Sequence, residues 1–156
     1  MDVEATIEDL EAQAYFASFS GGSLGKSETS VVQVCFKELA ELTCYLKQPL
    51  LGRDFIAGFP SKFAPQWMIV PLSEVTSLIE LTGTISQTEI SMSELIRNSL
   101  LEAKVILRPT AQSPIVSGVI KAILGSLVRI QSVNKQVELF PLANIHSLAV
   151  EKLSGQ

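Results

Sequence analysis

Apolar residues in the second half of the chain follow the period-2 spacing of strands that bury one face, with many β-branched side chains. These runs cover residues 104–108, 115–123, 127–131, 137–140 and 145–150. Gly125 separates two of the runs, and residues 133–136 have the composition of a hairpin turn. The pattern predicts an antiparallel meander of strands followed by a short closing strand.

Two other segments show the spacing of helices. Ser91-Met-Ser-Glu94 is a capping box, in which the Ser91 hydroxyl accepts from a free first-turn N–H and Glu94 reaches back. It leads into an apolar stripe made of Met92, Leu95, Ile96, Leu100 and Ala103. An earlier helix is expected to begin at Ser27 or Thr29. Its stripe would contain Val31, Val32, Cys35, Leu39 and Leu42.

The chain also contains an internal repeat. Residues 68–78 read MIVPLSEVTSL and residues 138–148 read ELFPLANIHSL, so that Pro71 matches Pro141 at a separation of 70 residues. Proline removes a ladder donor and fixes φ, so each chain segment should leave its sheet there for one turn. A helix, a meander of strands, a one-turn interruption and a closing strand are the plan of a small SH3-like or Sm-like barrel.

We therefore predict a mainly β chain with helices (α+β), built of two tandem small SH3-like or Sm-like barrels, each preceded by a helix. Residues 1–26 would form an acidic N-terminal helix and a Gly/Ser linker, residues 27–83 the first helix and barrel, and residues 84–153 the second. The first barrel is expected to be compressed, because the interval from Gly58 to Pro71 is shorter than that from Gly118 to Pro141. A lost hairpin would leave that barrel open along one edge, which a second barrel or a neighbouring subunit must cover.

This layout resembles an uncharacterised family of bacterial proteins that have an acidic N-terminal helix and two tandem Sm-like barrels. The residues that carry the resemblance are Asp9-Leu10-Glu11-Ala12, Val70-Pro71-Leu72 and Phe140-Pro141-Leu142. The resemblance implies a fold and no reaction.

Composition favours association. The chain is 47% hydrophobic and 18% charged, against about 25% charged residues in typical soluble domains. Its longest uncharged run, residues 12–25, is shorter than the roughly 18 residues that span a membrane. Asp2 and Glu4 stand where a signal peptide would be basic. We expect a cytoplasmic protein whose Cys35 and Cys44 are buried free thiols, with two cores that share an interface or with a homo-oligomer.

The residues offer little for catalysis. SFSGGSLGKSETS, residues 18–30, looks like a phosphate-binding loop, but Ser20 stands where the motif needs its first Gly. His146 is the only histidine, and strand alternation places it outward, facing solvent or an interface. No carboxylate pair lies in apolar surroundings. We expect no catalytic residue, no cofactor and no metal site, and hence no enzyme.

Two binding functions remain. The first is a protein-interaction or self-assembly module, in which a strand edge accepts a partner strand or the acidic head docks in trans through Val3, Ile7, Leu10 and Ala14. The alternative is weak RNA or other nucleic-acid binding by the second barrel. The Lys-His or Arg-Gly pair of RNA-binding Sm-like proteins is replaced here by Leu142-Ala143, but three cations can still contact phosphates. These are Lys121, Arg129 and Lys135.

Overall fold

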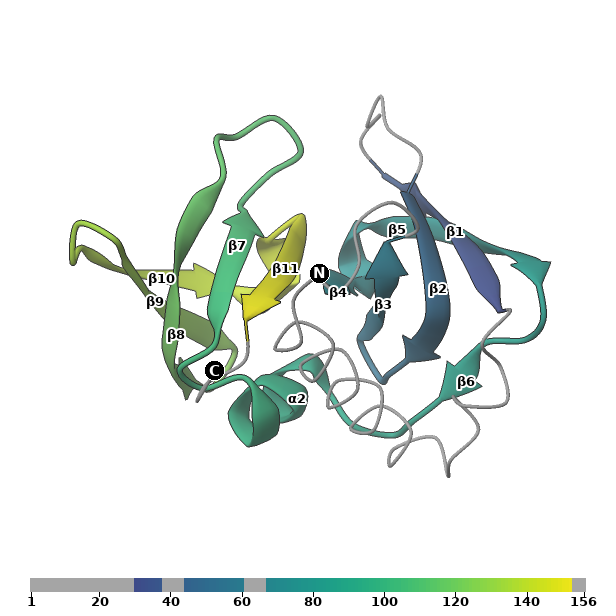
Figure 1. Cartoon of the computed structure of the whole chain (residues 1–156), viewed down its shortest axis with the longest axis horizontal. Helices are drawn as coiled ribbons and strands as arrows, with labels where there is room; N and C mark the ends of the chain where they lie inside the picture. The colour runs from purple at the N-terminus through teal and green to yellow at the C-terminus, as the bar shows by residue number, and fades with distance from the viewer. Residues whose placement is uncertain (1–29, 38–43, 61–66, 153–156) are drawn as a thin grey trace, which may run out of the picture.

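The protein folds around one large sheet (Figure 1). The computed structural model describes residues 30–37, 44–60 and 67–152. The strands of this part are β1 (Val31–Phe36), β2 (Cys44–Leu51), β3 (Phe55–Pro60), β4 (Trp67–Pro71), β5 (Val75–Thr82), β6 (Ser86–Gln87), β7 (Lys104–Arg108), β8 (Val116–Leu124), β9 (Leu127–Ser132), β10 (Val137–Pro141) and β11 (Ser147–Lys152). One α-helix, α2 (Met92–Ser99), and two 3-10 turns, η2 (Leu72–Glu74) and η3 (Leu142–Asn144), complete the described elements.

The strand order is the same in both halves of the sheet. The first half has the order β5-β1-β2-β3-β4 and the second half the order β11-β7-β8-β9-β10. In each half, four consecutive strands form an antiparallel meander and a fifth returns to pair with the first. The short strand β6 lies off this path and pairs parallel to β2.

The halves meet where β4 pairs antiparallel with β11, with Leu148 opposite Ile69 and Ala149 opposite Met68. This joint makes the sheet continuous across both halves, in the order β10-β9-β8-β7-β11-β4-β3-β2-β1-β5. The predicted mainly β class is confirmed. The described strands form an 11-stranded sheet without a closed barrel.

Both prolines of the internal repeat end a strand, as the sequence predicts. Pro71 (φ −65°) precedes η2, and Pro141 (φ −66°) precedes η3. The first amide of each turn is held in the same way: Leu72 N–H donates to the Asp54 carbonyl and Leu142 N–H to the Ser126 carbonyl, both at 2.9 Å. The sequence match therefore reflects the same local structure.

The predictions for the second half are also confirmed. Strands β7 to β11 follow the five period-2 runs to within a few residues, and Gly125 turns the chain between β8 and β9 with φ +61°. Both hydrogen bonds of the capping box of α2 are present. Glu94 N–H donates to Ser91 Oγ at 3.2 Å, and Ser91 N–H donates to Glu94 Oε1 at 3.3 Å.

The prediction of a first helix through Val31 was wrong, because these residues form β1. Val32 and Val34 are buried while Val31 and Gln33 are partly exposed, which is the alternation of a strand. β-branched side chains favour this conformation over a helix. Leu39 and Leu42, the other end of the expected stripe, and the acidic head of residues 1–26 lie outside the described residues.

The prediction that the first barrel is compressed was also wrong. Four strands precede the 3-10 turn in each half, so that no hairpin is missing from the first. The two glycines used for the comparison are not equivalent: Gly58 lies in the third strand of its half, and Gly118 lies in the second strand of the other. The interval from Gly58 to Pro71 is shorter because it spans fewer strands.

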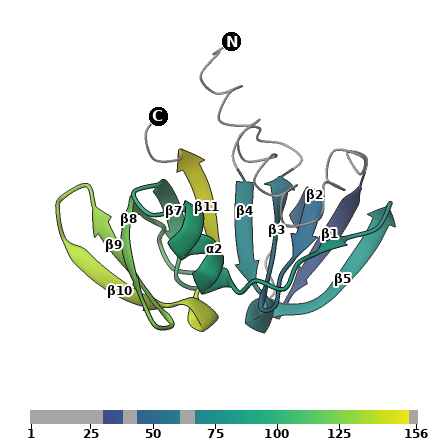
Figure 2. The same cartoon turned by 90° about the horizontal axis from the view of Figure 1, so that it is seen from below.

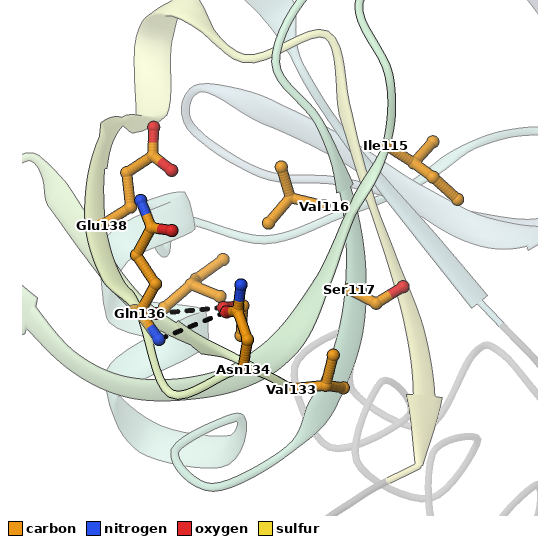
Figure 3. A pocket seen from close by; sticks show the side chains of 9 residues that line it. Ile115, Val116, Ser117, Val133, Asn134, Gln136 and Glu138 are labelled. Atoms are coloured by element: carbon orange, nitrogen blue, oxygen red, sulfur yellow. Dashed lines mark hydrogen bonds between the residues drawn. The ribbon is translucent and has the colours of Figure 1, made fainter.

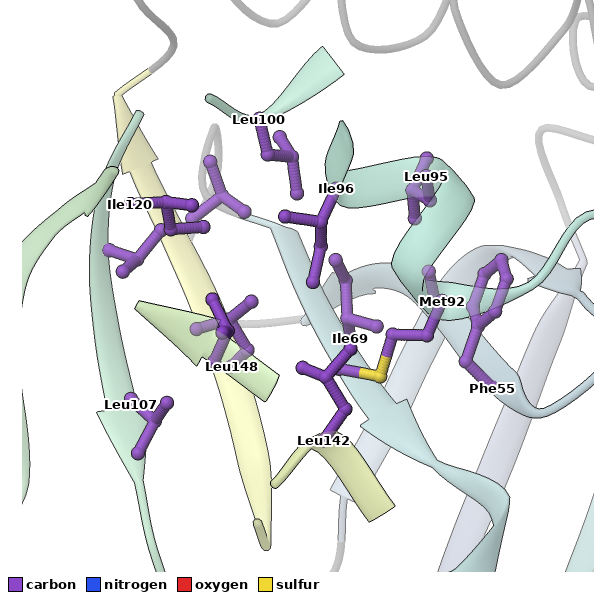
Figure 4. Packing of buried hydrophobic residues seen from close by; sticks show 14 of the residues in the cluster. Phe55, Ile69, Met92, Leu95, Ile96, Leu100, Leu107, Ile120, Leu142 and Leu148 are labelled. Atoms are coloured by element: carbon purple, nitrogen blue, oxygen red, sulfur yellow. The ribbon is translucent and has the colours of Figure 1, made fainter. Parts of the chain in front are cut away.

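The main hydrophobic cluster is shared by the two halves and lies under α2 (Figure 4). Met92, Leu95 and Ile96 of the helix are buried in it, and Phe55 and Ile69 contribute from the first half. A hydrogen bond ties the helix to the first half as well, since Met92 N–H donates to Asp54 Oδ1 at 2.7 Å. A carboxylate at a helix N-terminus is stabilising because it meets free amides and the positive end of the dipole.

A smaller cluster belongs to the first half alone. Its buried members are Val32, Val34, Leu46, Ile56 and Val70. The first half therefore contributes residues to two cores, its own and the one it shares with the second half. The ten strands of the continuous sheet path therefore cover two separate hydrophobic cores.

Replacement of Gly118 tests the close packing of β8 on β9. A Cβ at this position would lie 2.5 Å from the Gln131 carbonyl oxygen, and that backbone is fixed by strand pairing. We expect Gly118→Ala to cost about 1–3 kcal/mol of unfolding free energy, and to lower Tm by roughly 2–12 °C. The matched control is Gly125→Asn, because Asn tolerates a positive φ and no atom lies within 4 Å of that position. Equal losses of Tm in thermal denaturation of the two variants would contradict the packing described.

Candidate functional site

The two ends of the sheet are the main candidate for a binding surface. Among the described residues, β5 pairs only with β1, and β10 pairs only with β9. Figure 2 shows these two strands on opposite sides of the molecule. An unpaired strand edge offers backbone N–H and C=O groups to another strand, and most proteins cover or protect such edges.

Both edge strands carry exposed apolar side chains. In β5, Ile79 and Leu81 are 44% and 48% exposed, and in β10, Val137 and Leu139 are 52% and 43% exposed. Each pair encloses one exposed acid, so that the edges read Ile79-Glu80-Leu81 and Val137-Glu138-Leu139. On β10, which pairs regularly with β9, Val137 and Leu139 share one face and Glu138 lies on the opposite face. On β5, a register shift at Leu81 interrupts this alternation after Glu80.

A hollow of about 370 Å³ lies next to the β10 edge (Figure 3). It is lined by Ile115, Val116, Ser117, Ile130, Ser132, Val133, Asn134, Gln136 and Glu138. Asn134 Oδ1 shapes one wall, where it accepts from Gln136 N–H at 3.3 Å and from Ser132 Oγ. Glu138 is the only titratable residue of the lining, which therefore has no second group for acid–base chemistry.

The three predicted cationic contacts lie in the second half but differ in surroundings. Lys121 Nζ is 3.0 Å from Glu102 Oε1, an ion pair that offsets its charge. Arg129 is half-buried on β9. Lys135 is exposed in the β9–β10 turn, with φ +67°. Their role toward nucleic acid stays a prediction.

His146 lies between the two halves. Its ring stacks on Phe36 of β1, with ring centroids 4.3 Å apart and an interplanar angle of 22°. The side chain is buried, and Nδ1 is 3.4 Å from Ser147 Oγ. Of the two sequence alternatives, solvent exposure was wrong and an interface position is right, because η3 returns the chain beside the first half. No signal near His146 in the sequence indicates Phe36 as its neighbour.

Both cysteines are free and half-buried. Cys44 Sγ lies 3.8 Å from Met68 Sδ, and burial raises the pKa of the Cys44 thiol from 9.0 to about 11. Within residues 30–37, 44–60 and 67–152, no cluster of His, Cys, Asp and Glu could hold a metal ion. In that same part of the chain, no helix is long and apolar enough to cross a membrane. Residues 18–29, most of the loop that looks like a phosphate-binding motif, lie outside it.

No protein-family model, curated protein or solved structure matches this chain.

The raised pKa of Cys44 predicts an unusual pH profile of its reactivity. The thiolate is the form that alkylates, so in a Cys35→Ser variant the iodoacetamide rate should keep rising to about pH 11. The same variant unfolded in concentrated urea is the control, and its rate should level off near pH 9. A folded-state profile that levels off at the same pH as the control would contradict burial of the thiol.

The same shift predicts how stability depends on pH. Between pH 9 and about 11 the folded chain keeps the Cys44 proton, whereas the unfolded chain has lost it. Because the native state binds more protons in this window, the free energy of unfolding falls as pH rises. Urea denaturation at pH 8 and pH 10.5 should show a smaller loss of stability in Cys44→Ala than in the parent chain. An equal loss would mean that Cys44 ionises alike in both states.

Proposed function

We propose that this protein is a non-enzymatic self-assembly module that joins copies of itself through the edges of its sheet. The observation that carries the proposal is the pair of edge strands, β5 and β10, each with exposed apolar residues. Strand addition gains affinity from backbone hydrogen bonds and specificity from alternate side chains.

We also propose that each half is one copy of a small SH3-like or Sm-like barrel module. The equal strand order and the two equivalent proline exits support this reading. So do the register shifts in the second strand of each half, between Lys47 and Leu50 in β2 and between Ile120 and Ala122 in β8. Such bulges bend a strand, which curls a five-stranded sheet around its own core.

Two modules of this kind explain why edges remain. An open five-stranded module has two edges, its fourth strand and its fifth. The β4·β11 joint uses one edge of each module, and β5 and β10 are the edges left over. Their apolar side chains are a reason for further pairing, because burial of apolar surface stabilises by about 25 cal/mol per Å².

Binding is favoured over catalysis by the composition of the hollow beside β10. Its lining contains one carboxylate and no His, Cys, Lys or Arg. A nucleophile with its base, or an acid with its base, needs two such groups within hydrogen-bond reach. The hollow is therefore suited to contact a neighbouring surface.

A lysine on either edge tests the assembly. Leu81→Lys and Leu139→Lys each place a charge among the exposed apolar residues of one edge, so we expect the dissociation constant of the oligomer to rise by roughly tenfold or more. Sedimentation velocity over a range of protein concentrations measures this change.

The matched control is Leu101→Lys, which is 37% exposed on the turn after α2, away from both edges. It should leave the dissociation constant unchanged, and all three variants should keep the Tm of the parent chain to within a few degrees. A parent chain that sediments as a monomer at every concentration would refute self-assembly.

A further inference from the structure

We infer that the joint between copies repeats the joint within the chain: β5 of one copy pairs antiparallel with β10 of the next. This inference rests on the proposed function and adds which two edges pair and the register of their pairing. It also makes the contact head to tail, because the two edges are different strands of the module.

The first argument is the kind of strand at each edge. The internal joint pairs a fourth strand, β4, with a fifth strand, β11. Among the described strands, the edges with a single strand partner are again a fourth strand, β10, and a fifth strand, β5. The two edges are thus the same two kinds of strand that already pair inside the chain.

The second argument is burial at equivalent positions. The 70-residue repeat relates Ile69 to Leu139 and Leu148 to Leu78. At the internal joint, Ile69 and Leu148 face each other and are both 0% exposed. At the free edges, Leu139 is 43% exposed and Leu78 is partly exposed. Leu139 is thus exposed at a position that is fully covered inside the chain, and Leu78, which packs on the core of its own half, is less buried than Leu148.

The third argument is charge, which disfavours one of the two neighbouring registers. Copying the internal register places Leu78 opposite Leu139, Ile79 opposite Glu138 and Glu80 opposite Val137. The two acids then point to opposite faces of the sheet. A slip of one residue in one direction would place Glu80 directly opposite Glu138, where like charges are destabilising. A slip in the other direction would place Glu80 opposite Gln136.

One contact of the internal joint is absent between copies. The two 3-10 turns lie side by side in Figure 2. Ser73 Oγ of η2 donates to the Ala143 carbonyl of η3, and these two residues are equivalent in the repeat. Between copies the roles exchange: residue 143 of one copy would donate to the carbonyl of residue 73 in the next. Ala143 has no hydroxyl, so the joint between copies lacks this hydrogen bond.

A head-to-tail joint leaves the same two edges after each addition. Such heterologous contacts close into a ring when the rotation allows it and otherwise continue as a filament. A joint between two copies of the same edge would instead stop at a dimer through that edge.

Cysteine cross-linking between copies tests the pairing. In a Cys35→Ser, Cys44→Ala background, one batch of protein carries Ile79→Cys and another carries Glu138→Cys. Directly opposite residues have Cβ atoms about 4.5–5.5 Å apart, close to the separation in a disulfide. Mild oxidation should give a covalent dimer in the mixture and little in either batch alone. Ser77→Cys mixed with Glu138→Cys is the control, because Ser77 lies two residues, about 7 Å, from Ile79 in the regularly paired part of β5.

The outcomes separate the two proposals. Covalent dimers in either batch alone, if that batch still assembles in sedimentation, would overturn the head-to-tail joint. The proposal of self-assembly would remain. Equal yields from the 79/138 and 77/138 mixtures would overturn the register. A parent chain that stays monomeric in sedimentation would overturn both proposals.

A gain of affinity provides a second test. Ala143→Ser supplies the missing hydroxyl at the joint between copies, and its backbone carbonyl still accepts from Ser73 inside the chain. One added hydrogen bond should lower the dissociation constant by about two- to tenfold. Ala143→Val is the control for side-chain size, and it should not strengthen association. An unchanged dissociation constant in Ala143→Ser would count against equivalent joints.

Discussion

The pairing of β4 with β11 is the contact on which the rest of the structure depends. It turns two groups of five strands into one sheet. The helix α2 packs beside the joined halves. Its Met92 side chain lies in one cluster with Phe55, and the Met92 N–H donates to Asp54 Oδ1. His146 meets Phe36 across the same boundary. The main core, the contact of α2 with Asp54 and the ring stack all join residues of the first half to residues after β6.

The same contact determines which edges of the sheet lack a second strand partner among the described residues. A strand pair uses one edge from each side, and the edges that remain are unlike each other. Their exposed residues, Leu139 among them, occupy positions that are covered inside the chain at Ile69. The hollow beside β10 has a single titratable residue, Glu138, in its lining.

The sequence predicted the features that depend on near neighbours along the chain. The capping box at Ser91, the turns at Gly125 and the exits at Pro71 and Pro141 are local, and each was found. The first strand was mistaken for a helix because Val31 and Cys35 also fit a helical stripe over so short a segment.

Long-range features were not predictable in this way. The pairing of Leu148 with Ile69 and the stacking of His146 on Phe36 join residues far apart in the chain. A strand's own alternation states which face is buried but not which strand lies beside it. Because β4 and β11 belong to a single polypeptide, their contact does not depend on protein concentration. Dilution therefore cannot separate the two halves of the sheet, because each single chain contains both strands of this pair.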